Sequence, residues 1–154
     1  MYKSGYENLT NVDYSKNVIT QMAARTSHMK KMKWEVMDVT DLKYPDESFD
    51  LAIDKSTIDA LLCGDNAFIN VAKMLKEAQW VLKPGGVYLA ISYGKPENWE
   101  FHFEREHLDF TLKLYSLCKA LFTLDPVSCK TQEEKEEKSH YVYVCTKGDN
   151  KEKT

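Results

Sequence analysis

The 154-residue chain lacks the features that mark membrane or nucleic-acid-binding proteins. No apolar run approaches the roughly 18 residues that cross a bilayer, so we expect no membrane partner. The net charge of −3 lacks the basic excess of a nucleic-acid surface, so we expect no nucleic acid either. The first ten residues, MYKSGYENLT, contain no apolar signal core.

Cysteine is scarce, and no two cysteines form a C-x-x-C pair. This spacing argues against zinc, and we expect no metal site. Four cysteines can in principle form two disulfides, but without a signal core we expect free thiols in a reducing compartment and therefore a cytoplasmic protein. The four are Cys63, Cys118, Cys129 and Cys145.

What is present is ordinary for a globular protein. Apolar residues make up 43% of the chain and charged residues 29%, which is too apolar for disorder. We expect one domain over residues 1–147 and a disordered tail over 148–154. Short apolar strands alternate with helical segments, which predicts an α/β fold with a mostly parallel sheet.

The expected elements follow from apolar periodicity. Strands are predicted over 9–13, 33–38, 49–54 and 87–92, and helices over 16–27 and 66–82. Ser15 or Asp13 can cap the first helix, and KPGG ends the second with a turn. The stretch 93–110 reads as an aromatic loop with at most one helical turn. Strands over 110–122 and 140–147 are predicted to form an antiparallel pair, joined through the solvated charged run KTQEEKEEKS.

Three consecutive predicted strands end at a carboxylate, namely Asp13, Asp38 and Asp54. The carboxyl ends of parallel strands line one crevice of an open sheet, and ligands bind there. An acid in that place can accept hydrogen bonds from ribose hydroxyls or from the exocyclic amine of a base. Each aspartate alone can instead be a helix cap or a turn residue. Three of them in register favour a nucleotide-like cofactor.

Several motifs make the sequence resemble the class I S-adenosylmethionine-dependent methyltransferases. VLKPGG before a strand is common in that superfamily. NVDYS, WEVMDVTDLKYPDESFDLAIDKSTIDALL and ISYGKPENWEFHF resemble the methyltransferase-like group that includes lysine methyltransferases of translation elongation factor 1-alpha. That group usually has DKGTLDAL or EKGTLDAL where this chain has DKSTIDAL, so Ser56 replaces a glycine. The resemblance extends from residue 1 to 92 and, more loosely, beyond.

The resemblance implies a Rossmann-like sheet and roles for particular residues. Asp13 would bind the cofactor ribose with Tyr14 beside it, and Asp38 and Val39 would contact the adenine, with Met37 lining the pocket. A second set would lie near the methionine end and the substrate entrance: Asp54, which is also a hypothesis for orienting an amine, with Lys55, Ser56, Tyr93 and Trp99. No residue is predicted to be catalytic, because the sulfonium is already a good leaving group and the protein mainly positions the reactants.

The resemblance also implies a missing piece. Relatives begin with a strand, a G-x-G loop and a helix, of which only the helix end is expected here, with Gly5 as its C-cap. The absent strand would lie between the strands at Leu9 and Phe49 and would leave two unpaired edges. Three explanations stay open: the chain is truncated, these two strands pair directly, or a partner chain supplies the strand.

The implied activity is transfer of a methyl group from S-adenosylmethionine to a protein lysine, with a translation factor as a candidate substrate. A first alternative is a non-catalytic pseudo-methyltransferase that acts as a protein-interaction module, favoured by Ser56 and by the absent glycine loop. A second is a dehydrogenase-type nucleotide binder, which VLKPGG and the terminal antiparallel pair disfavour.

Overall fold

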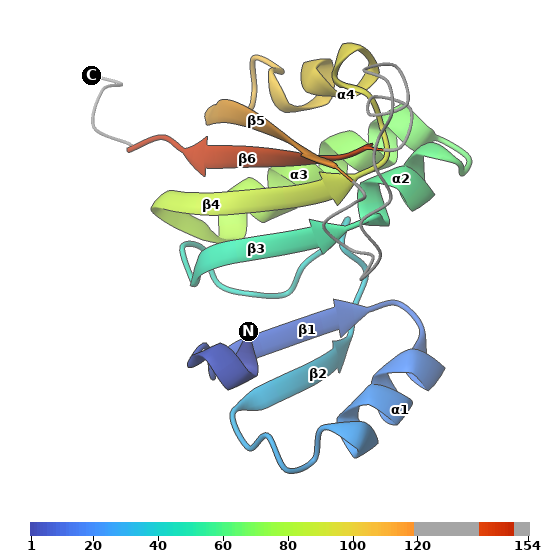
Figure 1. Cartoon of the computed structure of the whole chain (residues 1–154), viewed down its shortest axis with the longest axis vertical. Coiled ribbons are helices and arrows are strands. Elements are labelled where there is room, and N and C mark those ends of the chain that lie inside the picture. Colours follow the sequence, from blue (N-terminus) through green and yellow to red (C-terminus); the bar gives the residue numbers. More distant parts are fainter. Residues whose placement is uncertain (119–138, 150–154) are drawn as a thin grey trace. The chain divides into compact units, whose positions relative to one another are not determined.

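The computed structural model describes residues 1–118 and 139–149, which divide into two compact units, Met1–Lys43 and Tyr44–Thr154 (Figure 1). The expectation of a single domain over 1–147 stays a prediction. No helix in the described part of the chain is long and apolar enough to span a bilayer.

The first unit is a βαβ arrangement preceded by a single 3-10 turn. Its elements are the 3-10 helix Tyr2–Ser4, β1 (Leu9–Asp13), α1 (Lys16–Arg25) and β2 (Met32–Val36). Strands β1 and β2 are parallel, with Asp13 opposite Val36. Gly5 ends the 3-10 helix in the left-handed conformation at φ 92°, which confirms the expected C-cap glycine. The side chain of Ser15 accepts a hydrogen bond from Val18 N, which confirms Ser15 as the cap of α1.

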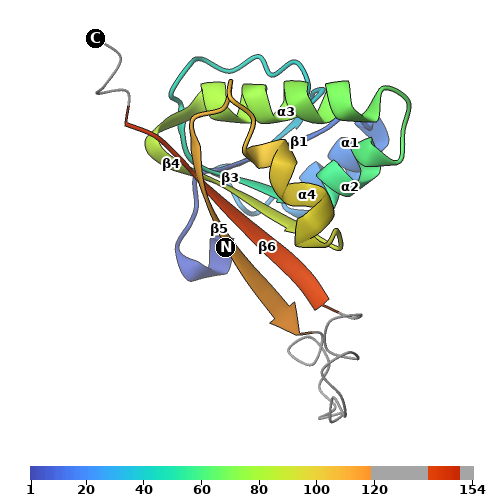
Figure 2. The same ribbon diagram turned by 90° about the horizontal axis from the view of Figure 1, so that it is seen from above.

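The second unit is a four-stranded sheet with helices packed on it. Its elements are β3 (Phe49–Lys55), α2 (Thr57–Leu62), α3 (Ala67–Val81), β4 (Leu82–Ser92), α4 (Pro96–Phe103), β5 (Phe110–Cys118) and β6 (Ser139–Lys147). The strand order is β3-β4-β6-β5, with β3 parallel to β4 and β6 antiparallel to both of its neighbours. Helices α3 and α4 lie on one side of this sheet (Figure 2).

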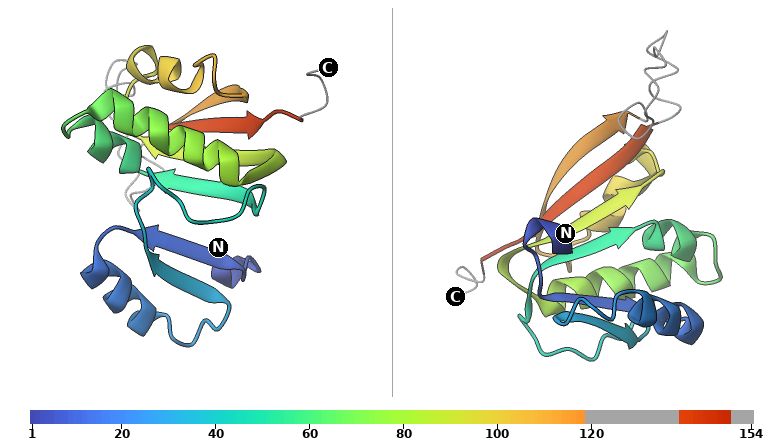
Figure 3. Two further views of the ribbon diagram at one scale, coloured as in Figure 1. Left: turned by 180° about the vertical axis from the view of Figure 1, so that it is seen from behind. Right: turned by 60° about the horizontal axis from the view of Figure 1, so that its bottom comes forward.

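The core of the second unit lies between α3 and the sheet, where the long helix crosses the strands (Figure 3). Helix α3 buries Val71 and Leu75 completely, and β6 contributes the fully buried Tyr143. The ring of Tyr143 stacks on Phe103 of α4 with the centroids 5.0 Å apart. Full burial of side chains this large contributes about 1.5–3 kcal/mol each, so this unit has a substantial apolar core.

The architecture confirms an α/β fold with a C-terminal antiparallel pair. Of the strand pairs in the described residues, β1–β2 and β3–β4 are parallel, while β4–β6 and β5–β6 are antiparallel, so parallel pairs do not predominate. The last four residues of the predicted strand 110–122, the charged run up to residue 138 and the tail from residue 150 lie outside the described residues.

The KPGG segment was expected to separate helix from strand by a turn, and this prediction is wrong. Helix α3 passes directly into β4, which begins at Leu82. Leu82 pairs with Phe49 and Val87 pairs with Leu51, so the register shifts and the glycines form a bulge within the strand. Gly85 has a φ of 73°, a conformation that glycine adopts without a steric cost.

Two helices were missed. The motif TIDALL forms α2 and the segment PENWEFHF forms α4, where the sequence predicted at most one helical turn. Both are short, and α4 has Pro96 in its first turn, where proline is compatible with a helix. Their apolar residues are too few to display a helical period, so tertiary packing on the sheet decides these two elements.

Each unit leaves both outer edges of its sheet without a partner among the described residues, and β1 and β3 are two of these edge strands. Strand β1 pairs only with β2, and β3 pairs on one side only, with β4. Direct pairing of the Leu9 and Phe49 strands, one of the three explanations offered for the missing strand, stays a prediction, because these strands belong to different units.

Candidate functional site

Asp13 is the last residue of β1, as the sequence predicted, and one oxygen of its carboxylate accepts a backbone hydrogen bond. Asp13 Oδ1 accepts a hydrogen bond from Ser15 N at 2.8 Å, and the Asp13 carbonyl accepts one from Met37 N at 3.0 Å. The side chain is half-buried, whereas the next residue, Tyr14, is 85% exposed. The two contacts fix the backbone around the acid, and the exposed tyrosine beside it is available to a ligand.

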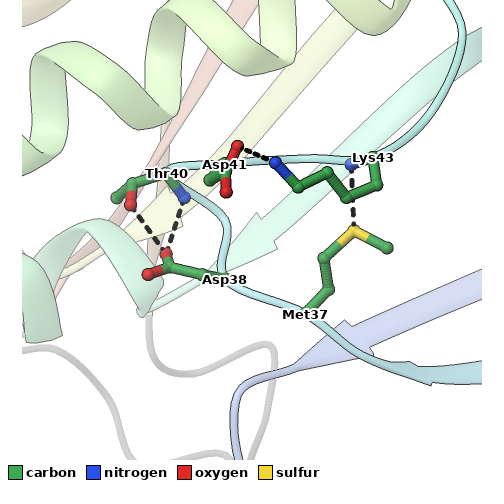
Figure 4. A network of polar contacts seen from close by, with 5 residues as sticks. All are labelled: Met37, Asp38, Thr40, Asp41 and Lys43. Carbon is green, nitrogen blue, oxygen red and sulfur yellow. Dashed lines mark hydrogen bonds and ion pairs between the residues drawn. The ribbon is translucent and has the colours of Figure 1, made fainter.

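Asp38 organises the loop that follows β2 (Figure 4). Its Oδ1 accepts hydrogen bonds from both the N and the Oγ1 of Thr40, each at 2.8 Å. Lys43 closes the same loop, because its ammonium pairs with Asp41 and its backbone N lies 3.4 Å from the sulfur of Met37. Asp38 therefore acts as a turn residue, which is one of the two functions that the sequence analysis considered for it.

The first unit therefore brings two carboxylates to one edge. Strand β1 ends at Asp13, whereas the parallel strand β2 ends at Val36, so the predicted strand 33–38 was too long and Asp38 lies two residues beyond the carboxyl end of β2. Met37 and Val39 are half-buried and flank Asp38 with apolar surface. The carboxylates can accept hydrogen bonds from hydroxyl and amine groups, and the apolar side chains can pack on a flat ring. Such a combination is suited to binding a nucleoside. No group of metal-ligating residues exists in the described part of the chain.

Asp54 ends β3 and serves as the cap of α2. Its Oδ1 accepts from Thr57 N at 2.7 Å, and its Oδ2 accepts from Ile58 N at 3.0 Å and from the hydroxyl of Tyr88 at 2.9 Å. Burial, reinforced by the charge of Asp54, raises the pKa of Tyr88 well above its usual range, so this hydroxyl remains a donor. Of the roles left open for Asp54, helix capping is the one that these hydrogen bonds show.

Lys55 and Ser56 follow in the motif that carries the resemblance. Lys55 is exposed, and the backbone N of Ser56 donates to Ile91 O at 3.0 Å. Ser56 has a φ of 64° and makes no capping hydrogen bond with its side chain. A left-handed backbone is strained for most residues with a side chain, serine among them, and carries no such strain for glycine, the residue that the resemblance implies at this place.

Ser56→Gly is expected to raise the free energy of unfolding by about 0.5–1 kcal/mol, because relief of the left-handed strain exceeds the entropy lost to glycine. Urea unfolding of the variant and of the wild-type chain measures the difference. Ser48→Gly, in an exposed loop residue with ordinary φ, is the matched control and should lower stability slightly. A destabilised Ser56→Gly variant would contradict the strain argument.

Tyr93 and Trp99 differ in their surroundings. Tyr93 is 62% exposed, and its ring centroid lies 4.2 Å from that of His140. Trp99 is half-buried, and its indole covers Gly94 so closely that a Cβ built there would lie 2.1 Å from Trp99 Cε2. Tyr93 is therefore accessible to a ligand, while Trp99 packs on the β4–α4 loop. Their predicted substrate contacts stay predictions.

A polar network that the sequence analysis missed lies at the end of β4. Ser92 Oγ donates to Asp59 Oδ1 at 2.6 Å and accepts from Gly94 N at 2.9 Å. The hydroxyl of Tyr143 donates to Gly94 O at 2.8 Å. A prediction that TIDALL forms a helix would have pointed to this network, because it places Asp59 in the first helical turn after β3.

The thiols in the described residues agree with the expectation of free cysteines. Cys63 is exposed and Cys145 is buried, and neither forms a disulfide. Burial raises the pKa of the Cys145 thiol to about 12, so this cysteine is an inert core residue.

Comparison with known proteins gives a consistent result. Residues 1–90 match the family model described as a methyltransferase domain. The chain is 32% identical over 121 residues to mouse EEF1A lysine methyltransferase 4, a match that covers 73% of this chain and 48% of the relative. It is 38% identical over 112 residues to the bovine eEF1A lysine and N-terminal methyltransferase, covering 69% of this chain and 16% of that protein. The chain thus spans half or less of the length of these relatives.

Solved structures share the fold at low identity. The N-methyltransferase NodS from Bradyrhizobium japonicum, in complex with S-adenosylhomocysteine, superposes with a TM-score of 0.64 at 15% identity, covering 92% of this chain and 67% of that one. A SAM-dependent methyltransferase from Methanosarcina mazei gives a TM-score of 0.59 at 16% identity, covering 92% and 82%.

Proposed function

The chain belongs to the methyltransferase-domain family and has its class I fold, and from this premise we propose that it methylates a lysine of a protein with S-adenosylmethionine. The observation that carries the proposal is the pair of carboxylates inside the matched region, with Asp13 at the end of β1 and Asp38 two residues after the end of the adjacent β2. Relatives named as methyltransferases of eEF1A support a translation factor as the substrate.

The residues of the first unit fit the nucleoside part of the cofactor. We assign Asp13 as the acceptor for the ribose hydroxyls and Asp38 as the acceptor for the adenine amine, with Val39 and Met37 against the ring and the exposed Tyr14 beside the ribose. When bound, the cofactor supplies a methyl group activated by its sulfonium. The residues of this chain then have only to hold the nucleoside, exclude water and position an amine.

The substrate side is assigned to the second unit. Lys55 ends β3 and Ser56 directly precedes α2, while Tyr93 directly follows β4 and Trp99 lies in α4. Asp54 supports this region through its cap of α2. We place the reaction in the cytoplasm, in keeping with the free thiols of the described residues.

A partner chain is part of the proposal because β3 has an open edge. The strand is rich in apolar residues, yet Leu51 and Ile53 are 38% and 47% exposed. An edge of this kind offers unpaired backbone groups to another strand. The same feature favours the alternative function, a non-catalytic module that binds a protein through this edge.

The test is unfolding of the purified chain in the presence of S-adenosylhomocysteine. At ten times the dissociation constant, a ligand specific for the native state raises the free energy of unfolding by about 1.4 kcal/mol. Asp38→Asn should weaken this response, whereas Asp41→Asn, a neighbouring exposed acid in the same loop, should not. Transfer of a labelled methyl group to purified eEF1A then tests the substrate. An unfolding curve that S-adenosylhomocysteine does not shift at any concentration would contradict the enzyme and favour the module.

A further inference from the structure

We propose that the carboxylate of Asp59 binds the amino group of the substrate lysine. This inference rests on the proposed function and names a residue for it. The acid lies in the first turn of α2, and its side chain reaches the end of β4, where its Oδ1 accepts the hydroxyl of Ser92 at 2.6 Å.

Asp59 is held in place by a fixed scaffold. Ser92 is fully buried, and its Oγ also accepts the backbone N of Gly94 at 2.9 Å. The Gly94 carbonyl in turn accepts the hydroxyl of Tyr143 at 2.8 Å. These contacts orient one oxygen of the carboxylate and tie it to the loop that leads into α4. Pre-organised acceptors of this kind bind a ligand with little loss of side-chain freedom.

The second oxygen of Asp59 has no hydrogen-bond partner within residues 1–118 and 139–149. Oδ2 is buried and accepts no hydrogen bond from any described residue. A buried polar atom left unsatisfied is destabilising, and far more so when it belongs to a charged group. The group that would complete it is an N–H donor with positive charge, because a charge-assisted hydrogen bond is about twice as strong as a neutral one.

A second unsatisfied group lies in α4, on a residue that packs on the loop between β4 and α4. Trp99 Nε1 is also buried and has no acceptor among the described residues, while its indole rests on Gly94. A lysine within a peptide offers both complements, since its ammonium is a donor and its backbone carbonyl is an acceptor.

The local charge favours a cationic ligand as well. The pKa of Tyr143 is raised first by burial and then by the negative charges of Glu100, Glu97 and Asp59, among others. Three carboxylates therefore act on one hydroxyl at this end of the second unit. A positive group that enters this field is attracted to it, and a neutral isostere is not.

Asp59 is a better candidate for this role than Asp54. The two oxygens of Asp54 already accept three hydrogen bonds, from Thr57 N, Ile58 N and the Tyr88 hydroxyl. Binding an amine there would compete with the two bonds that cap α2 or with the bond that satisfies the buried Tyr88 hydroxyl. Asp59 has one described donor and one open oxygen, so it can accept an ammonium without losing a contact.

The experiment compares two probes on the whole chain by ¹H–¹⁵N NMR titration. The first is N-acetyl-lysine methylamide, and the second is N-acetyl-norleucine methylamide, which lacks the ammonium. The wild-type chain should bind the lysine probe at least about tenfold more tightly than the norleucine probe, a difference typical of one charged hydrogen bond. Asp59→Asn should abolish this preference, and Asp65→Asn, the same charge change at an exposed acid of the same unit, should retain it.

The outcomes separate this inference from the proposed function. Equal preference in the wild-type chain and in Asp59→Asn, or no preference in the wild-type chain, overturns the role of Asp59. S-adenosylhomocysteine binding is measured on the same samples: its loss in the wild-type chain overturns the proposed function, even where the lysine preference persists. Should Asp59→Asn not fold, Asp59→Ser replaces it, because a serine hydroxyl can still accept the hydrogen bond of Ser92, and the same loss of preference is expected.

Discussion

Asp54→Ala is expected to lower the free energy of unfolding by about 3 kcal/mol. The substitution removes the cap of α2, a loss of about 1 kcal/mol, and it leaves the buried Tyr88 hydroxyl without an acceptor, which costs a further 1–3 kcal/mol. Asp54 is only 6% exposed, so water cannot replace the lost carboxylate. Urea unfolding followed by circular dichroism measures the change.

The control for Asp54 is Asp50→Ala on the same strand. Asp50 is exposed and pairs with Lys83 at 2.7 Å, a surface ion pair that contributes about 1 kcal/mol or less. The double variant Asp54→Ala/Tyr88→Phe removes the stranded hydroxyl as well, so it should lose less stability than the two single variants combined. A loss below about 1 kcal/mol for Asp54→Ala would contradict the capping role.

His102 is expected to make the protein less stable in mild acid. Burial, together with the positive charge of Arg105, lowers the pKa of His102 from 6.5 to about 4. The ring is almost fully buried against Phe101 and Phe68, and its Nδ1 lies 3.1 Å from the Arg105 guanidinium, which favours the neutral form with Nδ1 as the acceptor. The folded state therefore resists protonation of this histidine.

The sign and window of this effect follow from linkage. The folded pKa lies below the unfolded one, so the stabilisation is present above pH 6.5 and is lost as the pH falls from there toward 4. Between about pH 7 and about pH 5 the loss amounts to roughly 2 kcal/mol, from 1.36 kcal/mol per pKa unit. His102→Gln, which retains an acceptor for Arg105, should remove most of this loss.

The measurement is the free energy of unfolding at several pH values between about 7 and 5, a range above the usual pKa of carboxylates. His107→Gln is the matched control, because His107 is exposed and follows in the same segment. It should leave the pH dependence unchanged. Equal slopes for His102→Gln and the wild-type chain would show that the acid sensitivity has another origin.

The elements that the sequence predicted well are those whose signal is local. The strand at Leu9–Asp13 and the Ser15 cap were predicted correctly, and α3 was predicted within one residue at each end. Each of these signals, an apolar strand, a capping hydroxyl and a helical period, depends only on residues close together in the sequence. The acids predicted at strand ends follow from the same pattern: Asp13 is the last residue of β1 and Asp54 the penultimate residue of β3. The prediction is wrong for Asp38, which lies two residues after the end of β2.

The predictions that failed depend on contacts distant in sequence. The KPGG bulge is set by pairing with β3, and α2 and α4 are too short to form without the sheet beneath them. The amine-binding candidate Asp59 was missed for the same reason, since its hydrogen bond to Ser92 joins residues 33 positions apart.

The sequence by itself determined the α/β class, the family and the set of acids at the strand ends, because apolar period and motif spacing are properties of the chain. Only the tertiary structure decided what each acid does. The carboxylate of Asp54 accepts hydrogen bonds from α2 and from the Tyr88 hydroxyl. The buried Oδ2 of Asp59, in contrast, accepts no hydrogen bond from the described residues. A carboxylate is available to a ligand only when its neighbours in space leave an acceptor unfilled, and those neighbours are brought together by folding.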